Sequence, residues 1–284
     1  MVTRTSRQFA DSTGHVCIRL HIRLWNVFGE ILVYNIIWTQ QATEQIVGCD
    51  RRAPSRVMQG IKLVIFDIAG TVIEDAGQVP TAFTAALGNY GIEIKSDSIR
   101  EVRGASKREV IQRFVERQPG IRNADINNRT EEIYNSFRSI LAGLYEQDGV
   151  REIPGATETF TWLRHRDVRV ALNTGFDRTI TELLLESMHW ERDLINAVAC
   201  GDDVLHGRPA PDLIFKAMER AEVASVQQVA NVGDTVLDLQ AGQNAGVRSN
   251  IGVLSGAHSR EQLEREPHTH LLSSVAELPA LWAP

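Results

Sequence analysis

The sequence of 284 residues predicts an α/β protein, a doubly wound parallel sheet with a helical cap inserted after its first strand. Two observations predict this fold. From residue 61 onward, short apolar runs alternate with stretches of helical periodicity, which is typical of βαβ units around a parallel sheet. Between the first and second runs, about a hundred residues carry helical patterns and no strand pattern.

The expected strands are apolar runs of four to six residues, followed by one weaker run. They are Ile61–Phe66, Val168–Leu172, Ala197–Cys200, Val229–Val232, Ser249–Val253 and, more weakly, His270–Leu272. The expected helices of the insert lie near residues 80–90, 106–118 and 129–147. An insert directly after the first strand lies over the carboxyl ends of the sheet, where open α/β sheets bind ligands. We therefore expect a core of residues 61–75 and 151–284 and a cap of residues 76–150.

Residues 1–60 differ from the rest in charge, with 7 Lys and Arg against 4 Asp and Glu, whereas the remainder has 23 against 32. This segment shows no capped helix and no cluster of strands, so we expect a poorly ordered N-terminal extension. Met58 lies just before the first well-formed strand, and the domain could start there. A targeting role is an alternative, because arginines outnumber the acids early in the segment.

Composition excludes several classes of protein. A formal charge of −6 and a pI of 5.8 do not suit a protein that binds nucleic acid or an anionic membrane through a broad basic surface. Cys17, Cys49 and Cys200 show no C-x-x-C spacing, which argues against a disulfide framework or a structural zinc site and favours the cytoplasm. The most apolar early stretch, Trp25 to Trp38, is too short and too polar to span a membrane.

Chemically useful side chains follow four of the expected strands. Each has a structural explanation when taken alone, because acids and hydroxyls at strand ends often cap the next helix. Together they would supply a carboxylate nucleophile, a hydroxyl donor, a cation and a pair of acids suited to a divalent cation. They are Asp67 in Asp67-Ile68-Ala69-Gly70-Thr71, Thr174 and Gly175, Arg208 in Gly207-Arg208-Pro209-Ala210-Pro211, and Asp234 with Asp238.

These four motifs, in this order over residues 61–256, resemble the haloacid dehalogenase superfamily of phosphoryl-transfer enzymes. The resemblance implies that Asp67 attacks phosphorus and forms an aspartyl-phosphate. It also implies a Mg²⁺ ion held by Asp67, the Ala69 carbonyl and Asp234, with Asp238 as a supporting acid near the metal. An anionic nucleophile needs such screening to approach an anionic phosphoryl group.

The same resemblance implies that Thr174 and the Gly175 amide bind phosphoryl oxygens, and that Arg208 neutralises charge where many relatives have Lys. Phosphatases of the superfamily usually carry a second Asp two residues after the nucleophile, as acid and base; that position is Ala69 here. Glu74 and Asp75 follow soon after, but a shift of five or six residues cannot be assumed to restore this group.

The motif Asp-x-Ala-Gly-Thr looks like that of phosphonoacetaldehyde hydrolase, or phosphonatase, in which a cap lysine forms an imine with the substrate aldehyde. Gly104 and Lys107 have the Gly-x-x-Lys spacing of that lysine. The family's Met and His near it are Arg103 and Val110 here, so substrate binding by Lys107 without imine formation is an open alternative. Arg103 could depress the pKa of Lys107 or bind a second anion.

We therefore expect a cytoplasmic, Mg²⁺-dependent hydrolase that acts on a small phosphonate or phosphorylated metabolite and cleaves a P–C bond as phosphonoacetaldehyde hydrolase does. The alternative is a phosphomonoesterase of the phosphoglycolate or sugar-phosphate type. A non-catalytic module that binds small anions is a third hypothesis. We expect neither nucleic acid nor a membrane as a partner, and self-association as a homodimer is open.

Overall fold

The computed structural model describes residues 3–10, 16–25, 31–38, 60–94, 103–190 and 193–283. The chain divides into two units, Met1–Ala53 and Pro54–Ala283. None of the helices in the described ranges combines the length and the apolar character that crossing a bilayer requires.

The first unit contains three antiparallel strands, β1 (Thr3–Ala10), β2 (Val16–Trp25) and β3 (Ile31–Trp38), in the order β1-β2-β3. The expectation that residues 1–60 hold no cluster of strands is therefore wrong. The signal was an alternation with a period of two in the sequence of β2, where apolar residues occupy every even position from Val16 to Leu24. Cys49 and Met58 lie outside the described residues.

The second unit is built on a six-stranded parallel sheet in the order β6-β5-β4-β7-β8-β9. All six predicted strands are present. They are β4 (Leu63–Asp67), β5 (Arg169–Asn173), β6 (Ala197–Ala199), β7 (Val229–Gly233), β8 (Ser249–Val253) and β9 (His270–Leu272). Because β4 lies between β5 and β7, the strand order reverses there, which is where such sheets form their binding crevice.

Helices cover both faces of this sheet, so β4 is buried on both sides, and its side chains alternate between two apolar clusters. Val64 and Phe66 belong to the cluster that contains Phe160, whereas Leu63 and Ile65 belong to the one that contains Leu213. The helices of the core are α6 (Ala156–Arg164), α7 (Arg178–Met188), α8 (Asp212–Arg220), α9 (Val236–Ala245), α10 (Arg260–Leu263) and α11 (Leu278–Trp282). Short 3₁₀ helices are η1 (Gly201–Asp203), η2 (Val226–Gln228) and η3 (Val275–Glu277).

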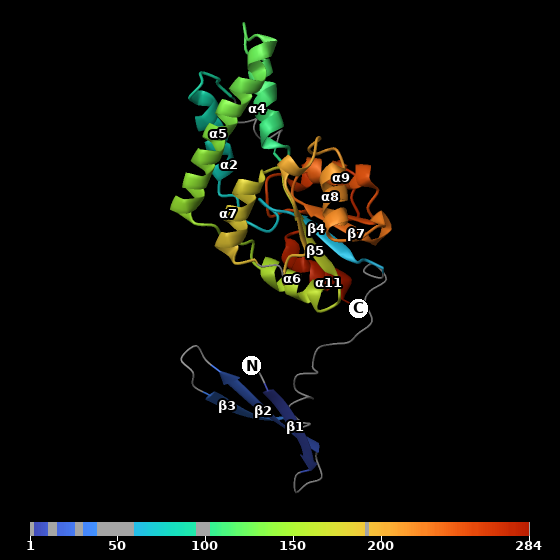
Figure 1. The fold of residues 1–284 in the computed structure, drawn as a ribbon. Coiled ribbons are helices and arrows are strands. Elements are labelled where there is room, and N and C mark those ends of the chain that lie inside the picture. Colours follow the sequence, from blue (N-terminus) through green and yellow to red (C-terminus); the bar gives the residue numbers. More distant parts are fainter. Residues whose placement is uncertain are drawn as a thin grey trace. The chain divides into compact units, whose positions relative to one another are not determined.

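The insert between β4 and β5 is helical, as the sequence predicts. Its described helices are α2 (Gln78–Gly88), α4 (Lys107–Glu116) and α5 (Asn123–Asp148), which lie together at the top of the view in Figure 1. The rings of Phe83 and Phe137 pack with their centroids 4.5 Å apart and join α2 to α5. This packing makes the insert a cap with apolar contacts of its own.

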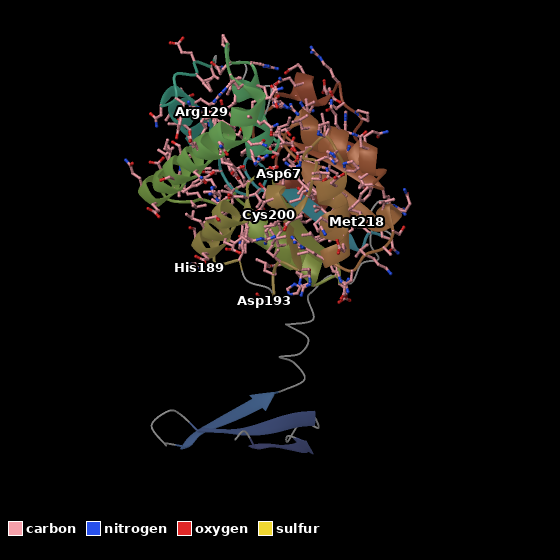
Figure 2. The ribbon with its side chains drawn as sticks, turned by 45° about the horizontal axis from the view of Figure 1, so that its top comes forward. Asp67, Arg129, His189, Asp193, Cys200 and Met218 are labelled. Carbon is pink, nitrogen blue, oxygen red and sulfur yellow. The ribbon has the colours of Figure 1, made fainter. Side chains whose placement is uncertain are left out.

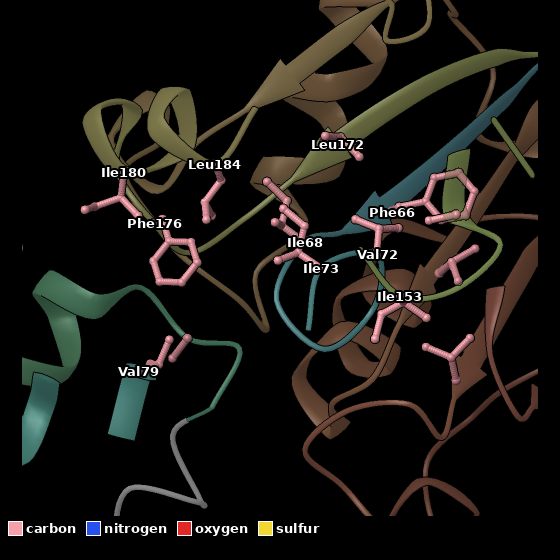
Figure 3. Close-up of a cluster of buried hydrophobic side chains, with 14 of the residues drawn as sticks. Phe66, Ile68, Val72, Ile73, Val79, Ile153, Leu172, Phe176, Ile180 and Leu184 are labelled. Atoms are coloured by element: carbon pink, nitrogen blue, oxygen red, sulfur yellow. The ribbon is translucent and has the colours of Figure 1, made fainter. Parts of the chain in front are cut away.

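The two connections between core and cap run side by side. Ile73 pairs with Glu152 in an antiparallel bridge, and the Glu74 amide donates to the Arg151 carbonyl over 2.9 Å. Ile68, Val72 and Ile73 of the outgoing connection pack against the sheet in the apolar cluster of Figure 3. The cap therefore leaves and re-enters the core at one place.

Candidate active site

The predicted residues meet at the carboxyl edge of the sheet. Asp67 is the last residue of β4 and pairs in register with Asn173, the last residue of β5, which Thr174 follows directly. Asp234 follows β7, the neighbour of β4 on the other side. Figure 2 shows Asp67 near the middle of this unit, between the green helices of the cap and the orange helices of the core.

Arg208 connects these strand ends. Its side chain is 1% exposed, and Nη1 donates to Asp67 Oδ1 at 2.7 Å, while Asp238 Oδ1 lies 2.9 Å from Nη1. Nη2 donates to the Asn173 carbonyl at 3.1 Å, and Nη1 also donates to the Gly104 carbonyl of the cap at 3.3 Å. A buried guanidinium with two carboxylate partners keeps its charge, so the site holds one fixed cation.

Three buried carboxylates gather around this cation. Asp67, Asp234 and Asp238 each present an oxygen within 4.8 Å of the others. Burial raises the pKa of Asp234 to about 8, and the neighbouring charges of Asp67 and Asp238 add to this effect. Burial also raises the pKa of Asp67 to about 6, although Arg208 opposes the shift. With Arg208 as the cation in contact with the cluster, burial and mutual repulsion therefore oppose the ionisation of all three carboxyls at once.

Such a cluster fits a Mg²⁺ ion, because hard divalent cations prefer carboxylate and carbonyl oxygens. Asp234 is held in place by the Thr71 hydroxyl, which donates to Oδ1 at 2.9 Å, and by the Ala257 amide, which donates to Oδ2 at 2.7 Å. Asp238 has both oxygens engaged, with Arg208 on Oδ1 and the Thr235 amide on Oδ2. Asp238 therefore links the acid cluster both to Arg208 and to the N-terminus of α9, where Thr235 is the capping residue.

Lys107 enters the site from the cap as the first residue of α4. Ser106 caps this helix by accepting from the Glu109 amide. The Lys107 side chain is buried, with Nζ donating to the Ala105 carbonyl at 3.1 Å and lying 4.9 Å from the centroid of the Phe176 ring. Burial lowers the pKa of this lysine to about 8, so a sizeable fraction is neutral near physiological pH.

Two glycines allow the cap to approach the core this closely. A Cβ on Gly104 would lie 2.4 Å from Thr235 Oγ1, and one on Gly175 would lie 2.4 Å from the Ala105 carbonyl oxygen. Gly104 also has a φ of +86°, which side-chain-bearing residues rarely adopt. The Lys107 amide donates to the Gly175 carbonyl at 3.3 Å and completes this contact.

One cavity lies between cap and core at this point. Its lining residues come from the end of β4, the outgoing connection, the cap and the ends of β5 and β7. They are Asp67, Ala69, Asp75, Val79, Phe83, Arg103, Gly104, Lys107, Thr174, Phe176, Asp234 and Thr235. Of the predicted residues, Arg208, Asp238 and Gly175 lie behind this lining and contact it as described above.

The sequence did not predict the contacts of two acids at the site, Asp75 and Glu109. Asp75 lines the cavity and pairs with Arg103, whereas the neighbouring Glu74 pairs with Arg151 at the surface over 2.8 Å. Glu109 accepts from the amide of Gly207, next to Arg208, at 2.9 Å. Their spacing in the sequence gives no sign of these contacts, because each depends on the path of a loop.

Comparisons with known proteins agree with this geometry. Residues 64–251 match the family described as haloacid dehalogenase-like hydrolase. A phosphonoacetaldehyde hydrolase of Latilactobacillus sakei subsp. sakei (strain 23K) is 29% identical over 237 residues, which cover 78% of this chain and 87% of that protein. Another, from Parabacteroides distasonis, is 31% identical over 219 residues, covering 74% of this chain and 82% of that protein.

Solved structures support the fold. A phosphonoacetaldehyde hydrolase-like protein from Oleispira antarctica aligns with a TM-score of 0.68 at 24% identity, covering 81% of this chain and 94% of that one. A hydrolase from Pseudomonas syringae aligns with a TM-score of 0.68 at 21% identity, and the alignment covers 77% of this chain and 96% of that one. Since the family model spans well over half of the sequence and the alignment with the Oleispira antarctica protein covers the sheet and the cap together, the chain belongs to the haloacid dehalogenase-like hydrolases.

Proposed function

We propose that this enzyme cleaves the P–C bond of a small phosphonate, as phosphonoacetaldehyde hydrolases do, with Asp67 as nucleophile and Lys107 as the amine that activates the organic part. The observation that carries the proposal is a buried lysine of lowered pKa, in one cavity with Asp67, where Ala69 occupies the position of the usual acid. A leaving carbon stabilised as an enamine needs no proton from that position.

In this reaction, the neutral Nζ of Lys107 adds to the aldehyde carbon, and water leaves to give an iminium. A carboxylate oxygen of Asp67 then bonds to phosphorus as the P–C bond breaks, and the electron pair of that bond passes into the iminium to give an enamine. Water hydrolyses the aspartyl-phosphate and releases inorganic phosphate. Protonation of the enamine at carbon and hydrolysis of the resulting imine release acetaldehyde and restore Lys107.

The surrounding residues would hold the reacting groups. Thr174 accepts from the Phe176 amide at 3.2 Å, which leaves its hydroxyl proton free to donate to a phosphonyl oxygen, with the Gly175 amide beside it. Arg208 holds Asp67 and offsets its charge. Asp67, the Ala69 carbonyl and Asp234 would bind Mg²⁺, supported by Asp238, and this ion would screen the nucleophile from the anionic substrate.

Trapping of the imine tests the proposal. The protein is incubated with phosphonoacetaldehyde and Mg²⁺, reduced with borohydride, and digested for peptide mapping by mass spectrometry. We expect an ethyl or phosphonoethyl secondary amine on Lys107. Lys107→Met removes the adduct, whereas Lys216→Arg, at an ion pair with Glu219 on α8, leaves it in place. Absence of an adduct, together with faster phosphate release from glycolate or sugar phosphates, would replace the proposal by a phosphomonoesterase.

Removal of the metal gives a second test. Dialysis against a chelator should abolish phosphate release and also lower the melting temperature, because three buried carboxylates then share Arg208 as their counter-charge. Adding back Mg²⁺ should restore both. A melting temperature that does not respond to chelator or Mg²⁺ would contradict a metal at this site.

A further inference from the structure

The cap side of the cavity holds an ion pair that the proposed reaction does not use. Arg103 donates through Nη2 to Asp75 Oδ2, and both residues line the cavity with Asp67 and Lys107. The Asp75 side chain is 3% exposed and that of Arg103 is 20% exposed. A carboxylate buried to this extent is costly unless it is paired, so the pair is a built feature of the cavity wall.

Each member of the pair is positioned from its own side. Asp75 Oδ1 accepts from the Gly77 amide at 3.0 Å, so one oxygen is held by the backbone and the other by Arg103. Arg103 directly precedes Gly104, which lies in close contact with Thr235 of the core. The guanidinium therefore has a fixed partner at a fixed place in the cavity.

The pair determines which charges are available to a substrate. Arg208 is taken up by Asp67 and Asp238, and Arg103 is taken up by Asp75. Among the described residues that line the cavity, Lys107 is the cation without a carboxylate partner within ion-pair distance. Val79 and Phe83 add an apolar part to the cap wall, and Phe176 lines the cavity from the core.

We propose that Asp75 determines substrate specificity: by occupying Arg103, it restricts the cavity to substrates with one anionic group, the phosphonyl or phosphoryl group, and an uncharged organic part. A second anionic group, such as a carboxylate, would find Arg103 occupied and would meet the charge of Asp75. This inference rests on the part of the proposed function that places a phosphorus-bearing substrate between Asp67 and Lys107.

A ligand with a second anionic group should bind more tightly when Asp75 loses its charge. In Asp75→Asn, the guanidinium of Arg103 loses its ion-pair partner and can form a charge-assisted pair with a carboxylate of the ligand. Two ligands separate this effect from phosphonate binding. Methylphosphonate carries the phosphonate alone, and phosphonoacetate adds a carboxylate at the place of the aldehyde in phosphonoacetaldehyde.

The test is isothermal titration calorimetry with Mg²⁺ present. The two affinities of the wild-type enzyme set the baseline, because Lys107 can already pair with the carboxylate of phosphonoacetate. In Asp75→Asn, the affinity for phosphonoacetate should rise about tenfold or more, while that for methylphosphonate changes less than about threefold. Asp75→Ser should give the same gain and replaces Asp75→Asn if that variant folds poorly, as judged by its melting temperature.

Two further variants control for indirect effects. The double variant Asp75→Asn with Arg103→Met should lose the gain, because the guanidinium is then absent. Glu74→Gln removes the same charge one residue away, at the surface pair with Arg151, and should change neither affinity.

The outcomes separate the inference from the proposed function. If Asp75→Asn binds methylphosphonate but gains nothing for phosphonoacetate, Asp75 does not determine specificity and the phosphonate site stands. If the gain persists without Arg103, the inference is also wrong. If the wild-type enzyme with Mg²⁺ binds neither ligand, the phosphonate site itself is overturned, and the inference with it.

Discussion

The two walls of the cavity differ in how their charged groups are held. On the sheet side, Asp67, Asp234 and Arg208 are each almost fully buried. Asp234 and Arg208 each have partners from more than one segment of the chain, and Asp67 is paired with Arg208. On the cap side, Arg103 is 20% exposed and relies on one carboxylate, and Lys107 Nζ donates to one carbonyl. In the proposed reaction, this difference corresponds to a division of roles: the buried strand ends would carry the attack on phosphorus, and the cap would select what reaches it.

The variant Asp67→Asn tests the proposed role of the sheet side, and its expected effect is the largest. Asparagine keeps the shape of the side chain but removes the nucleophilic oxygen, and Arg208 keeps Asp238 as a partner. We expect phosphate release to fall about 10³-fold or more with little loss of folding. Asp193→Asn, the same change at an exposed acid, should leave the rate unaltered. Turnover of Asp67→Asn within tenfold of wild type would remove Asp67 as nucleophile.

A change at the contact between the walls should have the next largest effect. In Gly104→Ala, the new Cβ would meet Thr235 Oγ1, and the cap would have to shift outward. We expect KM to rise about tenfold or more, measured by steady-state kinetics. Gly120→Ala has a similar backbone cost, with φ at +77°, but open space around its Cβ. Equal effects of the two variants would show that backbone strain, and not the contact, is responsible.

The pH profile examines the cap wall alone. Imine formation needs neutral Lys107, and burial lowers the pKa of this lysine to about 8. The amine is protonated below that pH, so kcat/KM for phosphonoacetaldehyde should fall about tenfold per pH unit on the acidic side. Arg103→Met removes a nearby cation that favours the neutral amine, so it should raise this pKa and shift the acidic limb to higher pH. If the acidic limb of the pH profile stays at the same pH in Arg103→Met, Arg103 does not influence the pKa of Lys107.

The smallest effect is expected where α4 supports the loop of Arg208. Glu109→Ala removes the acceptor for the Gly207 amide, and we expect KM to rise about fivefold, the value of one hydrogen bond. Glu109→Gln keeps an acceptor oxygen while losing the same helix-terminal charge, and it should remain within twofold of wild type. If KM rises equally in both variants, the charge of Glu109, and not its hydrogen bond to Gly207, is responsible for the effect.

Much of the fold could be predicted because parallel strands buried on both faces leave continuous apolar runs, such as Val229–Val232. The meeting of Asp67, Thr174 and Asp234 follows from the same cause, since parallel strands end at one edge of the sheet. Six strands and three cap helices therefore lie where the sequence places them.

The rest depends on loop paths that no local pattern encodes. Asp75 reaches the cavity because the Ile68 carbonyl accepts from the amides of Val72 and Ile73, and Ile73 then pairs with Glu152. A count of residues from Asp67 could not show that turn. The strands of residues 1–60 are a different case, because the alternation of apolar residues in Val16–Trp25 is a local pattern that predicts a strand.

The hydrogen bond from the Lys107 amide to the Gly175 carbonyl has a consequence for the arrangement in which turnover can occur. Any movement that lifts α4 from the sheet breaks it and separates the lysine from the loop beside Asp67. The arrangement that would allow Lys107 and Asp67 to act on one substrate is therefore the one in which this hydrogen bond is made.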